Sequence, residues 1–108
     1  MNAYLVLVFA VIFEIIATSS LKLSDGFSKF YPSLFVVVGY SSAFWLMSIT
    51  LKTLPVGIVY ALWSGLGIIG IAIIGGVYFK EAYTAWHVFG IFLILAGITI
   101  LSLVTNSH

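Results

Sequence analysis

One acidic side chain, Glu14, lies inside a long run of apolar residues near the start of the 108-residue sequence. If this run is a helix that begins near Ala3, Glu14 lies roughly 17 Å along its axis, close to the middle of a bilayer. Placing a carboxylate there costs about 2.5 to 3.5 kcal/mol, so we expect the side chain to face the protein interior. Desolvation penalises the charged form, and Glu14 is therefore expected to hold either a proton or a cation.

Small residues flank Glu14 on the same predicted helical face. Positions three and four residues apart share a face, which places Ala10, Ala17 and Thr18 beside the acid. These short side chains leave space for a bound molecule. They would equally let two helices approach closely, with Glu14 hydrogen-bonded across the contact. We favour the binding role, because a packing contact needs only a neutral polar residue at lower cost.

Aromatic side chains recur at helical spacing in two later segments. Tyr60 and Trp63 share one face, and Tyr40 and Phe44 share another. An acid among aromatic rings suits a lipophilic cation, because the rings add about 0.5 to 2 kcal/mol of cation–π attraction to the charge interaction. Rings in a membrane helix also pack or face lipid, which explains Phe44 equally well. Tyr60 and Trp63 are stronger candidates, since their polar atoms need partners when buried.

The composition requires a membrane environment for these residues. Apolar residues make up 63% of the chain and charged residues only 6%, whereas soluble domains carry about a quarter charged residues. The sequence has no cysteine and no arginine, and its two histidines lie far apart, which excludes a disulfide framework, a metal cluster and a basic nucleic-acid surface. Because no nucleophile, metal cluster or second acid accompanies Glu14, we expect no enzymatic activity. The isolated histidines lead us to expect no bound metal.

Four apolar stretches are long enough to cross the hydrocarbon core, which takes roughly 20 helical residues. Helix is the expected structure, since it satisfies its own backbone hydrogen bonds in lipid. We predict one all-α integral membrane domain over residues 1–108, with transmembrane helices at about 3–21, 33–51, 56–79 and 85–104. The connecting loops are short, and we expect them to pack the helices into a filled bundle.

Glycines mark two further features of these predicted helices. Gly65 and Gly67 fall within the third stretch, where a bend would let the two halves of the helix move separately. The same glycines also permit close helix packing, and the two roles are compatible. Gly90 and Gly97 lie one heptad apart in the fourth stretch, which predicts a surface for helix pairing.

A single copy of the chain is expected to surround a drug-sized cation poorly. A second copy would supply the missing walls and a second Glu14, and the two acids would then titrate as a coupled pair. With four spans, Lys52 lies on the side of the membrane opposite Lys22, Lys29 and Lys80, so the lysine bias that sets orientation is small. Two copies inserted in opposite directions would form an inverted pair. We therefore expect an antiparallel, dual-topology dimer.

Over essentially its whole length the sequence resembles the small multidrug resistance family of proton-coupled exporters. The resemblance rests on Tyr4, on Glu14 with Ala17-Thr18 and Leu21-Lys22, on Ser24-Asp25-Gly26-Phe27 before Pro32-Ser33, and on Pro55-x-Gly57-Ile58-x-Tyr60-Ala61-x-Trp63-Ser64-Gly65-x-Gly67. It implies four helices in an antiparallel dimer, with Glu14 binding protons and substrate in turn. It also implies that the substrate contacts Tyr4, Tyr40, Phe44, Tyr60 and Trp63, and that Gly90 and Gly97 serve the dimer contact.

The multidrug branch of this family fits the sequence better than the guanidinium-exporting branch. The latter usually has tryptophan three residues after the acid, where this sequence has Ala17. We therefore expect an antiporter of the bacterial cytoplasmic membrane that exports quaternary ammonium and aromatic cations, driven by the proton gradient without a cofactor. Three alternatives stay open: export of guanidinium-type solutes, a structural or regulatory membrane subunit, and pairing with a homologous subunit instead of a second copy.

Overall fold

Four helices make up most of the chain in the computed structural model, which describes residues 2–106. They are α1 (Ala3–Leu23), α2 (Phe30–Thr50), α3 (Val56–Val77) and α4 (Ala85–Asn106), and this confirms the all-α four-helix fold. By length and composition, α1, α2 and α3 can each cross a membrane, and Ala85–Leu101 of α4 forms a shorter apolar stretch.

The α2 helix begins at Phe30, three residues before the expected start. Pro32 falls in its first turn, where backbone amides have no acceptor within the helix, so proline fits there without loss of a hydrogen bond. The Ser33 hydroxyl donates to the carbonyl oxygen of Lys29 at 2.6 Å and closes this turn. The proline therefore lies inside the helix rather than before it.

Ser24 holds the connection between α1 and α2, and its side chain is fully buried. Its hydroxyl donates to the Leu21 carbonyl oxygen at 2.7 Å and accepts from the Phe27 amide at 3.1 Å. Asp25, Gly26 and Phe27 all have positive φ angles, a left-handed conformation that reverses the chain quickly. The compact turn brings α2 back along α1.

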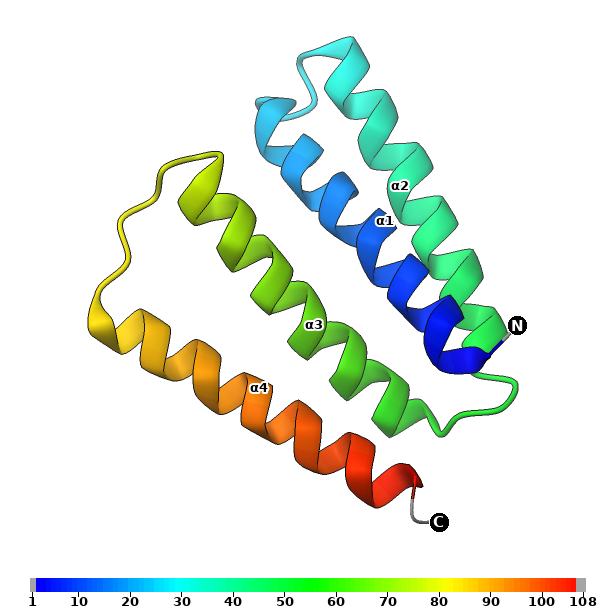
Figure 1. The fold of residues 1–108 in the computed structure, drawn as a ribbon. Coiled ribbons are helices and arrows are strands. Elements are labelled where there is room, and N and C mark those ends of the chain that lie inside the picture. Colours follow the sequence, from blue (N-terminus) through cyan, green and yellow to red (C-terminus); the bar gives the residue numbers. More distant parts are fainter. Residues whose placement is uncertain (1, 107–108) are drawn as a thin grey trace.

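The four helices form a flat row rather than a filled bundle (Figure 1). α1 lies between α2 and α3, and α4 packs against the other side of α3. The molecule measures 46 × 35 × 18 Å, and among the described residues α4 packs closely only against α3. The expected filled bundle is therefore wrong. In lipid no hydrophobic force drives α4 to close over the other helices.

Close contacts between neighbouring helices depend on glycine. A Cβ atom at Gly39 of α2 would lie 2.8 Å from the Cβ atom of Ala17 in α1, which is too close for any other residue at this spacing. At the contact between α3 and α4, Gly65 faces the side chain of Ile98. A small core cluster, formed by Leu7 of α1 with Val59 and Leu62 of α3, joins those two helices. These contacts fix α1 and α3 side by side.

Candidate functional site

The two carboxylate oxygens of Glu14 have different surroundings. Oε1 accepts a hydrogen bond of 3.1 Å from the Thr18 hydroxyl, one helical turn further along α1. Oε2 is buried and has no hydrogen-bond partner within residues 2–106. It lies against Gly67 of α3, where a Cβ atom would be only 3.2 Å away. One oxygen is therefore held in place, and the other is a buried acceptor without a hydrogen bond from the described residues.

Thr18 also links Glu14 to α2. Its hydroxyl oxygen lies 2.6 Å from the Tyr40 hydroxyl. Since the single Thr18 hydroxyl hydrogen goes to Glu14, the Tyr40 hydroxyl must donate to Thr18. The resulting chain from Tyr40 through Thr18 to Glu14 crosses from α2 to α1. It orients the carboxyl group through Oε1 alone, since Oε2 has no hydrogen-bond partner in the part of the chain that the structure describes.

A cavity of about 490 Å³ lies beside Glu14 along α3. Its volume falls within the range of about 300 to 1,000 Å³ that is usual for small-molecule sites. The wall is mostly apolar, with a few polar groups. The lining residues are Glu14, Tyr60, Trp63, Ser64, Gly67, Ile68, Ile71, Ala72, Glu81 and Tyr83.

Aromatic rings from α2 and α3 meet next to this cavity. The Trp63 ring meets the edge of Phe44 with 5.5 Å between centroids, and Phe44 stacks on Tyr40 at 6.1 Å. Trp63 and Tyr60 line the cavity, and Tyr60 is 66% exposed in the single chain. Five residues singled out from the sequence therefore lie together near Glu14, namely Thr18, Tyr40, Phe44, Tyr60 and Trp63. The aromatic side chains meet beside or line the cavity, and Thr18 and Tyr40 form the hydroxyl chain.

Three other residues singled out from the sequence have packing contacts in the single chain. Ala10 and Ala17 are fully buried, and Ala17 contacts Gly39 between α1 and α2. Tyr4 packs against the core cluster near the N-terminal end of α1. Contact of these three residues with a substrate stays a prediction.

The glycines singled out from the sequence lie in two environments. α3 is continuous from Val56 to Val77, with Gly65 against α4 and Gly67 against Glu14, so a hinge at these two glycines stays a prediction. By contrast, a Cβ atom at Gly90 or Gly97 of α4 would meet no atom within 4 Å. That face of α4 is open in the single chain, and its role in pairing also stays a prediction.

The connection between α3 and α4 adds a second acid to the site. Glu81 lines the same cavity as Glu14, so the expectation that no second acid accompanies Glu14 is wrong. The Glu81 amide donates to the Gly75 carbonyl oxygen at 2.9 Å, and Lys80 has a φ of 58°, so the loop turns back over the end of α3. Gly75 has no side chain, which leaves the space that the Glu81 carboxylate occupies.

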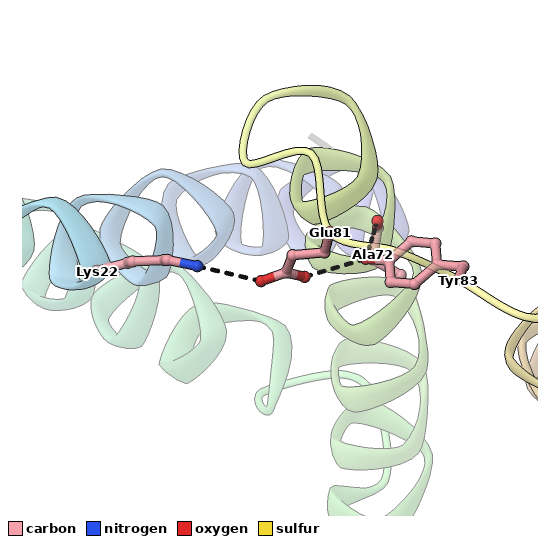
Figure 2. A network of polar contacts seen from close by, with 4 residues as sticks. All are labelled: Lys22, Ala72, Glu81 and Tyr83. Atoms are coloured by element: carbon pink, nitrogen blue, oxygen red, sulfur yellow. Dashed lines mark hydrogen bonds and ion pairs between the residues drawn. The ribbon is translucent and has the colours of Figure 1, made fainter.

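Glu81 belongs to a polar network at this end of the cavity (Figure 2). Its Oε2 lies 3.2 Å from the Lys22 ammonium of α1, and its Oε1 lies 3.3 Å from the Tyr83 hydroxyl. Tyr83 also donates to the Ala72 carbonyl oxygen. Partial desolvation, followed by the Glu81 charge, raises the pKa of Tyr83, so its hydroxyl stays a donor. The Lys22 ammonium lies 4.6 Å from the centroid of the Phe79 ring.

Comparison with known families decides the class of this membrane protein. The model of the family described as "Small Multidrug Resistance protein" matches residues 2–94. The chain belongs to the small multidrug resistance family. Membership in this family, together with its membrane-length helices, makes it a multi-pass protein of the bacterial cell membrane.

Relatives from this family are similar along nearly the whole chain. The quaternary ammonium compound-resistance protein QacE of Escherichia coli is 43% identical, over 99% of this chain and 97% of the relative. The multidrug resistance protein EbrA of Bacillus subtilis is 43% identical, over 92% and 94%. The multidrug transporter EmrE of Escherichia coli is 37% identical, over 99% and 97%. These are resistance and transport proteins, which agrees with the expectation of a chain that is not an enzyme.

Proposed function

We propose that this protein is an efflux transporter that exchanges lipophilic cations for protons, with Glu14 holding proton and substrate in turn. The observation that carries the proposal is Oε2 of Glu14, a buried oxygen that accepts no hydrogen bond from residues 2–106, on a carboxyl group that lines a mostly apolar cavity with Tyr60 and Trp63. An acid beside aromatic rings attracts a cation by charge and through the faces of the rings. The similarity to QacE, a quaternary ammonium compound-resistance protein, supports this class of substrate, and the similarity to EmrE, a multidrug transporter, supports transport.

Competition for one carboxylate couples the two ions. An ionised Glu14 binds the cation, and a proton that reaches Glu14 from outside the cell neutralises it and releases the cation. Loss of that proton on the cytoplasmic side prepares the site for the next substrate. Cation binding therefore strengthens as the pH rises, and it releases protons by linkage. The proton gradient supplies the free energy, so the cycle needs no cofactor.

Two copies in opposite orientations complete this site in our proposal. The single chain is a flat row with Tyr60 largely exposed, and a second copy would cover that side of the cavity. The open face of α4 around Gly90 and Gly97 is the proposed dimer contact, because small residues let helices approach closely in lipid. A bend at Gly65 and Gly67 would give access from the two sides alternately.

The apolar wall favours lipophilic cations over small polar ones. Ile68, Ile71 and Ala72 offer contact area but no hydrogen bonds from their side chains. A guanidinium ion would fill little of a cavity of about 490 Å³ and would gain little contact with its apolar wall. A tetraphenylphosphonium ion would instead bury aromatic surface against Trp63 and Tyr60. We therefore choose tetraphenylphosphonium as the test substrate.

The test is Glu14→Gln in proteoliposomes. The amide has nearly the same shape but neither exchanges a proton nor attracts a cation, so uptake of tetraphenylphosphonium driven by a pH gradient should fall to the level of empty vesicles. Its binding in detergent should lose its pH dependence. Asp25→Asn is the matched control, because it removes an acid from the loop between α1 and α2, and it should transport normally. Uptake by Glu14→Gln that still follows the pH gradient would refute the proposal.

A further inference from the structure

We propose that Glu81 forms a second cation subsite, so that compounds with a cation at each end are preferred substrates. This inference rests on the proposed function, because it extends the Glu14 site. Both carboxylates line one cavity, and the wall between them is mainly apolar. Two separated negative groups with an apolar wall between them complement a molecule that carries two cations joined by an apolar linker.

The separation of the two acids follows from α3. A Cβ atom at Gly67 would have Oε2 of Glu14 as its nearest neighbour. A Cβ atom at Gly75 would have Oε1 of Glu81 as its nearest neighbour. Eight helical residues separate these glycines, which corresponds to about 12 Å along the axis. Positions eight residues apart also fall on one broad helical face. The two carboxylates therefore lie on the same side of α3, about two turns apart.

The chain itself already places a cation at Glu81. The Lys22 ammonium lies 3.2 Å from Glu81 Oε2 (Figure 2). It also lies 4.6 Å from the centroid of the Phe79 ring. The Glu14 site has the same two components, because it combines the Glu14 carboxylate with the rings of Tyr60 and Trp63. The side chains of Lys22 and Glu81 are 56% and 47% exposed, so their ion pair is weak. A cationic group of a ligand can therefore replace the lysine.

Space is available for this exchange. Beyond Glu81 lies a smaller hollow of about 110 Å³, whose walls include Lys22, Phe79 and Ser19. The Ser19 hydroxyl is buried and has no hydrogen-bond partner in the described part of the chain, so its polar atom is available to a guest. Glu81 lines both hollows. A ligand head group or the displaced lysine can thus occupy either side of the Glu81 carboxylate.

The experiment uses bis(trimethylammonium)alkanes with linkers of increasing length, each compared with the alkyltrimethylammonium ion of the same length. At about 1.3 Å per bond along an extended chain, a linker of about eight methylenes spans the distance between the two acids. Affinities are measured by displacement of tetraphenylphosphonium from the full-length protein in detergent. The dications should show an optimum near this linker length, and the monocations should not.

Two substitutions should change this preference in opposite directions. Glu81→Gln should lower the ratio of dication to monocation affinity about fivefold at the optimal length. Lys22→Gln should raise the ratio, because it removes the competing ammonium. Asp25→Asn removes a loop acid at a positive φ that asparagine tolerates, and it should leave the ratio unchanged.

The outcomes separate this inference from the proposed function. If the unaltered protein binds tetraphenylphosphonium but Glu81→Gln leaves the ratio and the length optimum unchanged, the second subsite is wrong and the Glu14 site stands. If the unaltered protein binds no tetraphenylphosphonium at any pH, the proposed function itself is wrong. Should Glu81→Gln fail to fold, Lys22→Gln decides, and an unchanged ratio in that variant would overturn the subsite.

Discussion

At the scale of single residues, the site depends on Glu14, whose two carboxylate oxygens have different contacts. Thr18 holds one oxygen of Glu14 and is itself held by Tyr40, which fixes the direction of the carboxyl group. The other oxygen lies against Gly67, where a Cβ atom would be only 3.2 Å from it. The hydroxyl chain therefore orients the acid without occupying the oxygen that faces α3.

Trp63 provides the ring on which an aromatic cation is expected to lie. Trp63→Ala should weaken tetraphenylphosphonium binding about tenfold, because ring contact and cation–π attraction together contribute about 1 to 2 kcal/mol. The pH dependence of binding should persist, since Glu14 is unchanged. Trp45→Ala is the matched control, because Trp45 lies on α2 with its ring 65% exposed. Equal losses in the two variants, measured by equilibrium binding, would exclude a specific role for Trp63.

Helical periodicity explains why part of the site could be predicted. Spacing of three and four residues places Glu14 and Thr18 on one face, and Tyr60 and Trp63 on another, whatever the loops do. Glu81 could not be found in this way, because its place depends on the turn at Lys80 and on the missing side chain of Gly75. A charged residue at the end of a predicted span indicates only where the span ends.

At the scale of helices, α1 and α3 hold the two inner positions of the row, and each packs on both sides. The small residues of α1, among them Ala17, face α2, and Leu7 joins the core cluster with α3. The acid therefore lies on one of the two helices that are held by a neighbour on each side. Glycines in the partner helices set the distances, which in turn determine how closely Glu14 approaches α3.

Gly39→Ala tests the contact between α1 and α2. The added methyl group would lie 2.8 Å from the Ala17 Cβ atom and 3.2 Å from the Phe13 carbonyl oxygen, so the helices must separate. We expect the free energy of unfolding to fall by about 1 to 3 kcal/mol. The measurement is circular dichroism during denaturation with sodium dodecyl sulfate. Gly57→Ala is the control, because a Cβ atom there meets nothing within 4 Å; an equal loss in both variants would contradict the packing argument.

At the scale of the whole molecule, the number and order of the helices could be predicted, but their arrangement could not. The lengths of the apolar runs and the turn residues determine the four helices. The pairing of helix faces depends on local contacts such as that of Gly65 with Ile98. Helical periodicity does not indicate which faces meet. The prediction of a filled bundle applied the rule for soluble proteins, in which closing the bundle buries apolar surface away from water.

The open face of α4 gives a prediction on assembly. Gly97→Trp should convert a dimer in mild detergent to a monomer, because the indole would keep the two α4 helices apart. Leu95→Trp adds bulk to an exposed position on the opposite side of α4 and should leave the dimer intact. Sedimentation velocity at matched concentrations measures both variants. A Gly97→Trp protein that dimerises as strongly as the unaltered chain would place the contact elsewhere.

A thickness of 18 Å also shapes how this sequence can change over time. Among the described residues, many large apolar side chains, such as Phe35, Phe92 and Leu93, are more than half exposed in the single chain. Exchanges among leucine, isoleucine, valine and phenylalanine on those outer faces keep the surface apolar, so they change the free energy of folding little. The residues at the helix contacts and around the cavity therefore restrict substitution most strongly.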